Sequence, residues 1–438
     1  MSIPIIYIVS LTLMWLLMAI LMVRRFFSAP TFFLALGYYI VVLSAVIYIF
    51  DVGNERSRNL GIDGEASLLL QAIIVSIFSL ALIFGYHIGR YSNPLKNVLP
   101  VFDASQHDGL VLLGIFLLTV GSFLVAGMPL AGSGGDIAGA IHNIRHEEAL
   151  KGLHFLKQFN RLGTLLAAAY WVSLLQRRRG GQSITKARIW LVATLFMVNF
   201  LSGSIFGGKN FLIYPLLILV VCYAAAMLRR PIVFLTSMAV VLITFLGALQ
   251  YYRVAVIANA DYHPVHHTIT AMGLSLMDNN QIFLQTMTSP QHTTTGEDFF
   301  NGLAGVIPRS LWAGKPDQIT AGGRFKDIVV PGGQGGWPPF GFNQWYANFG
   351  WPGVMIGGLL SGLVLAALAL RYRHAYQDPF AMAFALYLTI MFLVPGGLGN
   401  MMFVKYVQNI VPLFIFKALS QKALVPSEIT KQPSGGRL

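Results

Sequence analysis

The chain has 438 residues, of which 55% are hydrophobic and only 11% are charged, and its mean hydropathy is +0.65. Soluble domains contain about 25% charged residues, so this composition excludes an ordinary soluble protein. The 44 glycines and 20 prolines follow no period, which excludes collagen and coiled coil, and so apolar a chain cannot stay disordered. We therefore expect an all-α polytopic membrane protein. A net charge of +13 would suggest nucleic-acid binding in a soluble protein. In a membrane protein the positions of the charges matter more than their sum, so we expect no nucleic-acid partner.

Eleven apolar runs are long enough to cross the hydrocarbon layer, which takes about 20 residues of helix. They lie near 3–22, 31–50, 66–87, 109–130, 159–175, 189–206, 211–228, 232–252, 351–370, 380–397 and 401–417. The first run has no basic segment before it and no cleavage site, so we expect a retained span and not a signal peptide. The predicted organisation is a bundle of eight spans over 1–252, a large outer loop over 253–350, three spans over 351–417 and a cytoplasmic tail over 418–438.

Lysine and arginine in short loops orient such a bundle, because they stay on the cytoplasmic side. With the N-terminus outside, the inner segments carry 17 basic and 4 acidic side chains, so that the whole excess of +13 lies on one side. The sequence therefore predicts a multi-pass protein of a bacterial inner membrane, with a periplasmic N-terminus, a cytoplasmic C-terminus and a periplasmic active face.

Two local features bear on packing. Gly353, Gly357, Gly358 and Gly362 recur on the ninth predicted span, and this spacing indicates close contact with another helix. The single cysteine, Cys222, lies in an apolar run, so the chain can form no internal disulfide and offers no cysteine-based metal site.

Four cations stand where predicted spans meet the outer face: Arg161, Lys209, Arg253 and Lys405. Each has apolar neighbours, so its charge is poorly solvated and a partner such as an anionic lipid-linked substrate is expected. The alternative is that these side chains only reach out to lipid headgroups.

The long outer loop carries further cations beside a predicted interfacial helix. Phe299, Phe300, Leu303, Val306 and Ile307 recur at helical spacing before Pro308, as in a helix lying on the membrane surface. Arg309, Lys315 and Arg324 follow, and the planar fork of arginine suits a diphosphate. The alternative is that these cations pair with acidic neighbours such as Glu297 and Asp298 in a structural network.

Acid–base candidates in the same loop are Asp261, His266, His267, Glu297 and Asp298. A sugar hydroxyl that attacks a glycosyl donor needs a base to take its proton. A metal site at the histidine cluster is the alternative, but no second group of ligands accompanies it, so we expect neither metal nor cofactor.

Aromatic residues accompany these groups, and we expect Trp312, Trp337, Trp345 and Tyr346 to stack on sugars or to pack at headgroup level. The glycine-rich stretch that contains Trp337 lacks the lysine of a phosphate-binding P-loop, so a nucleotide site is not expected.

Three patterns resemble the bacterial oligosaccharide repeat unit polymerases of the Wzy type, which act on O-antigen and capsule. They are IPRSLWAGKP at 307–316, WYANFGWPG at 345–353 and SGSIFGGKN at 202–210. Many members of that family carry glutamate before the second pattern, where this chain has Asn343 and Gln344.

The resemblance implies a membrane glycosyltransferase with a helical, GT-C-like fold that uses undecaprenyl-diphosphate-linked oligosaccharide as substrate. Such an enzyme moves the growing glycan onto a new lipid-linked repeat and releases the carrier diphosphate, without nucleotide sugar. It implies that Arg253, Arg309 and Lys315 hold the leaving diphosphate. The expected partners are the lipid bilayer and, as a candidate, a polysaccharide chain-length regulator. The alternatives are an O-antigen ligase with the same donor and a transporter or flippase of lipid-linked oligosaccharide.

Overall fold

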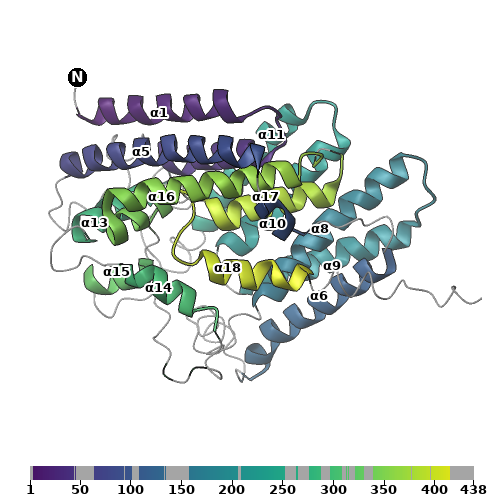
Figure 1. Cartoon of the computed structure of the whole chain (residues 1–438). Coiled ribbons are helices and arrows are strands. Elements are labelled where there is room, and N and C mark those ends of the chain that lie inside the picture. The colour runs from purple at the N-terminus through teal and green to yellow at the C-terminus, as the bar shows by residue number, and fades with distance from the viewer. Residues whose placement is uncertain are drawn as a thin grey trace, which may run out of the picture.

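The computed structural model is all helix within its described residues, where no strand occurs, which confirms the predicted all-α class for this part of the chain (Figure 1). The described residues are 3–43, 45, 64–92, 94–100, 108–132, 134, 157–205, 209–251, 263–264, 276–287, 296–307, 312, 314, 321–329, 339–375, 377–394 and 396–414.

The first half of the chain forms long helices at the predicted apolar runs. They are α1 (Ile3–Met22), α2 (Ala29–Gly37) with the π-helical turn η1 (Tyr38–Leu43), α5 (Gly64–Tyr91), the 3-10 turn η2 (Pro94–Val98), α6 (Asp108–Ala131), α8 (Lys157–Arg179), α9 (Lys186–Ile205), α10 (Lys209–Met227) and α11 (Pro231–Tyr251).

The second half combines three short helices with the last long ones. They are α13 (Leu276–Met287), α14 (Glu297–Ala304), α15 (Ala321–Val329), α16 (Gly341–Arg371), α17 (Pro379–Leu393) and α18 (Met402–Asn409). Helix α14 lies where the sequence predicted an interfacial helix; the apolar side chains of Phe300 and Leu303 are exposed on it, and Ile307 is exposed just after it. Helix α18 ends at Asn409, and residues 411–414 are helical again after one turn residue, so helical structure covers most of the described part of the run predicted at 401–417.

Among the described residues, four stretches are long and apolar enough to cross a membrane: Ile5–Met22, Ala66–Tyr91, Asp108–Gly127 and Gly341–Arg371. Shorter apolar helical stretches are Ile213–Met227, Pro231–Val241 and Pro379–Leu393. These helices indicate a membrane-embedded protein, whereas the count of eleven spans stays a prediction.

Helices α5 and α16 run in parallel and form the most extensive helix–helix contact of the described part (Figure 1). A Cβ atom on Gly358 would lie 2.5 Å from the carbonyl oxygen of Phe78, and one on Gly362 would lie 2.2 Å from that of Leu82. Gly85 on α5 is crowded in the same way by the backbone of α16. The two backbones thus touch through glycines, as small residues permit in membrane helix pairs. This confirms the close packing predicted from the glycine spacing.

Helix α16 begins ten residues before the predicted span, because it consists of two segments. Gly350 has φ 62° and ψ −148°, a conformation that favours glycine, and it kinks the helix just before Pro352. The first segment folds back against the second: a Cβ atom on Gly357 would lie 2.4 Å from the indole of Trp345. The predicted start at 351 coincides with the straight second segment.

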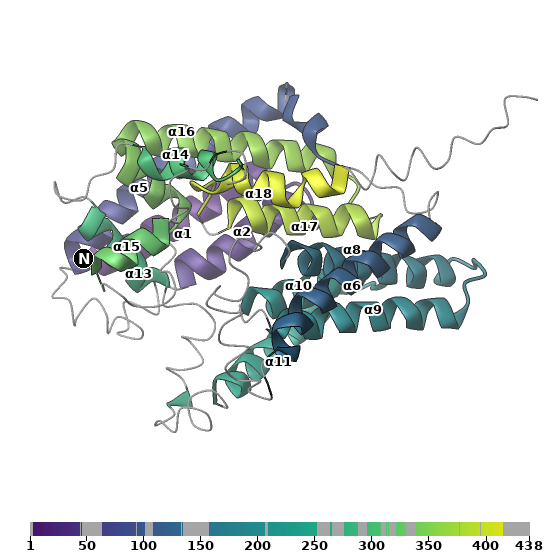
Figure 2. The same cartoon turned by 90° about the horizontal axis from the view of Figure 1, so that it is seen from below.

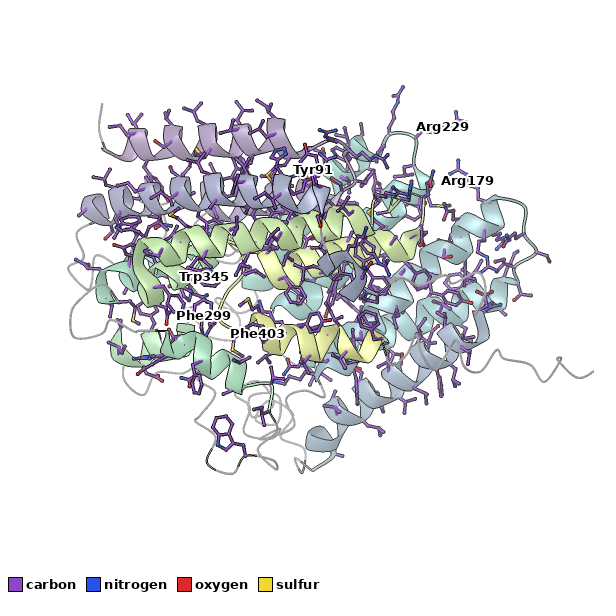
Figure 3. The ribbon with its side chains drawn as sticks, in the orientation of Figure 1. Tyr91, Arg179, Arg229, Phe299, Trp345 and Phe403 are labelled. Atoms are coloured by element: carbon purple, nitrogen blue, oxygen red, sulfur yellow. The ribbon has the colours of Figure 1, made fainter. Side chains whose placement is uncertain are left out.

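The helix ends that the sequence assigned to the inner side gather at one end of the bundle. Asp108 at the start of α6 forms ion pairs with Arg177 at 2.7 Å and Arg188 at 3.1 Å. In Figure 3, Arg179 and Arg229 lie at this end, away from Phe299 and Trp345. The common location agrees with the predicted partition of charge, and which side of the membrane this end faces stays a prediction.

Helices α6, α8 and α9 form a second group of helices (Figure 2), and polar side chains connect them within the apolar interior. The amide of Asn160 donates to Ser122 Oγ at 3.0 Å, and that of Asn199 donates to Thr119 Oγ1 at 2.6 Å. Hydrogen bonds of this kind hold helices together where lipid offers no competing partner.

The glycine contact between α5 and α16 predicts a specific weakness. We expect Gly362→Ala to lower the free energy of unfolding by about 1–3 kcal/mol, because its Cβ overlaps the backbone of α5. The matched control is Gly127→Ala on α6, which meets no neighbouring atom within 4 Å and is expected to be neutral or slightly stabilising. Thermal unfolding of both variants in detergent measures the difference, and equal unfolding temperatures would contradict the packing.

Candidate functional site

Polar side chains of the predicted outer loop converge on Asp298, in the first turn of α14. The side chain of Asp298 is only 1% exposed. Its Oδ2 accepts a hydrogen bond from Asn348 Nδ2 of α16 at 3.3 Å, and its backbone carbonyl accepts one from Asn400 Nδ2 at 3.3 Å. Its Oδ1 is buried and has no hydrogen-bond partner. Together with Glu297 and Arg324, these residues form what we call the Asp298 cluster.

Arg324 of α15 supplies the positive charge of this cluster. Its guanidinium lies 2.8 Å from the carboxylate of Glu297 and 3.6 Å from Oδ1 of Asp298. Glu297 is well exposed, with 64% of its side chain accessible, whereas Arg324 is 29% exposed. The sequence offered Arg324 either as a diphosphate ligand or as a member of an ion-pair network, and the structure places it in the network.

Burial controls the protonation of Asp298. Loss of solvent raises the pKa of its carboxyl above the ordinary value, and the nearby charge of Glu297 adds to the increase. The hydrogen bond from Asn348 and the charge of Arg324 act in the opposite direction but do not cancel it. A carboxyl group with a raised pKa is a stronger base than a solvated one, which suits it to accept a proton.

Two close contacts hold the cluster in place. On one side, Phe325 follows Arg324 and is fully buried, with its ring 5.3 Å from that of Phe283 on α13. On the other, a Cβ atom on Gly302 would lie 2.0 Å from the carbonyl oxygen of Asn400, so α14 lies directly against the chain that leads into α18. Each of the two helices that carry the cluster, α15 and α14, is thus packed against another part of the chain.

The aromatic residues beside the cluster pack against one another. Phe299 lies beside Trp345 (Figure 3), with ring centroids 4.3 Å apart. The ring of Phe349 packs on Phe299 at 5.2 Å. Trp345 is 6% exposed, and its indole N–H donates to the carbonyl of Leu398 at 2.8 Å. In this structure α16 folds back over the ring and Trp345 belongs to the interior, and its predicted role in stacking on sugars stays a prediction. Tyr346 packs on Trp351 at 4.8 Å, and its role stays a prediction, as does that of the partly buried Trp312.

Side-chain amides surround the first segment of α16, and the sequence did not single them out as site residues. Asn280 Oδ1 accepts from the backbone N–H of Phe340 at 2.7 Å and from Asn343 Nδ2 at 2.8 Å. Gln344 Oε1 accepts from the N–H of Asn400 at 3.0 Å. The available signal was an unusual run of amides in an apolar segment, since a buried amide requires a partner.

A second group of polar residues lies where α8 meets α18. Arg161 stands on α8 and Lys405 on α18, which is in contact with α8, and Tyr214 and Tyr387 lie beside Arg161. Among the described residues, no carboxylate forms an ion pair with Lys405. A cavity of about 20 Å³, with room for one water molecule, borders Arg161 and both tyrosines. The structure thus brings together two of the four predicted boundary cations.

Helix α18 connects the two groups. Asn400 of the Asp298 cluster stands just before α18, and Lys405 lies one turn inside it. The other predicted site residues lie outside the described residues: Arg253, Asp261, His266, His267, Arg309, Lys315 and Trp337, together with the side chain of Lys209. Within the described ranges, no three His, Cys, Asp or Glu side chains come together as a metal site would require.

Comparison of the chain with protein-family models, with curated proteins and with solved structures finds no match.

The raised pKa of Asp298 predicts a pH dependence of stability. The fold favours the neutral carboxyl, so this contribution to stability is present below the ordinary pKa of aspartate and is lost as the pH rises through the raised value. We expect the Asp298→Asn variant to lose less stability than the wild type as the pH rises. Thermal unfolding between pH 4 and pH 8 measures this difference. Asp327→Asn, an exposed carboxyl of α15, is the matched control and should keep the wild-type pH profile.

Proposed function

We propose that the chain is a membrane glycosyltransferase of the repeat-unit polymerase type, which transfers a glycan from undecaprenyl diphosphate to the sugar of a second lipid-linked repeat. The observation that carries this proposal is the buried carboxyl of Asp298 with its raised pKa, held beside the guanidinium of Arg324 at one end of an apolar helical bundle. The three sequence patterns that resemble such polymerases supply the substrate class.

In the proposed step, the acceptor hydroxyl attacks the anomeric carbon of the donor. The new glycosidic bond forms as the bond between that carbon and the diphosphate oxygen breaks, and the diphosphate leaves with the electron pair. The proton of the acceptor hydroxyl passes to Asp298, whose Oδ1 has no hydrogen-bond partner of its own. A buried carboxylate suits this role, because its raised pKa makes it a stronger base than a solvated one.

Cations stabilise the charge on the leaving diphosphate in this proposal. Arg324 exchanges the exposed carboxylate of Glu297 for a phosphate oxygen, since a solvated ion pair is weak and easily replaced. Arg161 and Lys405 supply two further charges beside the same helix, α18. Preorganised cations in a site with little water stabilise developing negative charge more strongly than solvent does.

The test of catalysis uses lipid-linked repeats extracted from a strain that lacks the gene, added to purified protein in vesicles. The wild type should lengthen the glycan and release undecaprenyl diphosphate. Asp298→Asn should reduce the rate of chain growth by about 10²–10⁴-fold, the range for loss of a general base. Asp327→Asn, with the same loss of charge at an exposed position of α15, is the matched control and should retain the rate. An Asp298→Asn variant that folds normally and retains the rate would contradict the role of Asp298.

The cations have a separate test in the same assay. Arg161→Gln, Lys405→Gln, Arg253→Ala and Arg309→Ala should each slow chain growth, because each removes a charge expected to face the diphosphate. Arg230→Gln removes a charge at the other end of the bundle and should leave the rate unchanged. Near-wild-type growth in both Arg253→Ala and Arg309→Ala would contradict the assignment of these two residues. Transfer to lipid A-core instead of to a repeat would favour the ligase, and movement of carrier without release of diphosphate would favour the flippase.

A further inference from the structure

A cavity of about 360 Å³ lies where the ends of α1, α5 and α16 meet the start of α2. Four arginines line it, Arg24, Arg25, Arg90 and Arg373, together with Ser28 and Tyr86. No residue of the Asp298 cluster lines this cavity: Asn348 stands before the kink of α16, whereas Ala369 and Leu370 stand near the other end of that helix. The cavity is therefore a distinct site, and binding of a ligand there does not depend on the proposed catalysis.

Three of these four arginines have no carboxylate partner within the part of the chain that the structure describes. Among the described residues, no Asp or Glu forms an ion pair with Arg24, Arg90 or Arg373. Other arginines at the same end of the bundle do have such a partner, since Arg177 and Arg188 both pair with Asp108. Several arginines around one cavity without a counter-charge attract an anion, and their planar guanidinium groups match the oxygens of a phosphate.

Hydrogen bonds hold the walls of the cavity. Arg25 donates to the carbonyl of Arg373 at 2.6 Å, which ties the turn between α1 and α2 to the end of α16. The hydroxyls of Ser28 and Thr31 both donate to the carbonyl of Arg25, at 2.9 and 2.7 Å. The guanidinium of Arg90 lies over the ring of Tyr86, 6.0 Å from its centre. The side chains of Arg25 and Arg90 are thus held in place before a ligand arrives, which reduces the entropic cost of binding.

Apolar side chains make up most of the remaining lining: Met22, Pro30, Ala369 and Leu370 border the cavity beside the arginines. The cavity lies at the ends of α1, α5 and α16, three helices that are long and apolar enough to cross a membrane, which is the level where lipid headgroups lie. A ligand with a phosphate beside hydrocarbon chains fits this combination, whereas free phosphate uses only the charged part. We propose that the cavity binds the phosphate group of an anionic phospholipid.

The experiment uses the full chain, purified in detergent and titrated with phosphatidylglycerol, cardiolipin or the zwitterionic phosphatidylcholine, with binding followed by native mass spectrometry and thermal shift. Inorganic phosphate and pyrophosphate are titrated separately. The test variant combines Arg90→Gln and Arg373→Gln. The matched control combines Arg229→Gln and Arg230→Gln, which removes the same charge from exposed residues of the α10–α11 connection that do not line the cavity. Ala369→Phe fills the cavity but keeps every arginine.

The wild type should retain the two anionic lipids in preference to phosphatidylcholine. The arginine variant should bind them about tenfold more weakly or worse, as expected when charge-assisted hydrogen bonds are lost, and Ala369→Phe should weaken binding without any change of charge. The control should bind like the wild type. Equal loss in test and control variants would show general attraction to a basic surface and overturn the proposal. Arginine-dependent binding of inorganic phosphate without lipid binding would overturn the lipid assignment.

Discussion

The contact of α5 with α16 through Gly85, Gly358 and Gly362 is the interaction on which both ends of the molecule depend. Between helices in lipid, burial of apolar surface provides little driving force, so association relies on van der Waals contact and on hydrogen bonds. Glycines bring the backbones together, and the turn after α17 uses the same surface: a Cβ atom on Gly397 would lie 2.2 Å from the ring of Phe78. Because α16 is long and held along its length, it carries Asn348 at one end and the wall of the arginine cavity at the other.

The polar groups at the two ends of α16 are stabilised in different ways: by mutual hydrogen bonds at one end, and by retained charge and hydration at the other. Around the first segment, amides satisfy one another and the backbone, as Asn280 does for Phe340 and Asn343. A single carboxyl, Asp298, is buried among them, and its raised pKa is the cost of removing it from water. At the other end, arginines keep their charge because a guanidinium remains ionised and partly hydrated, so a counter-anion is more favourable than neutralisation.

Short helices make the first of these arrangements possible. Helix α14 brings Asp298 under α16, and α15 delivers Arg324 with Phe325 as its anchor. The chain before α18 then closes the cluster through Asn400, and α18 carries Lys405 toward Arg161. Segments from four separate parts of the chain therefore meet at one end of the bundle, which is where a site for a large lipid-linked substrate would need to lie.

The sequence by itself determined the helical class, the positions of most long helices and the glycine contact, because these follow from the length of apolar runs and from local spacing. It also placed Glu297, Asp298 and Arg324 in one loop and offered ion pairing as an alternative for the arginine. Only the tertiary structure decided that Asp298 is buried and Glu297 exposed, that Arg324 pairs with both, and that Trp345 belongs to the interior. These outcomes depend on contacts between residues that are far apart in the sequence, such as Glu297 and Arg324, which are 27 residues apart. The local spacing of apolar residues does not predict such contacts.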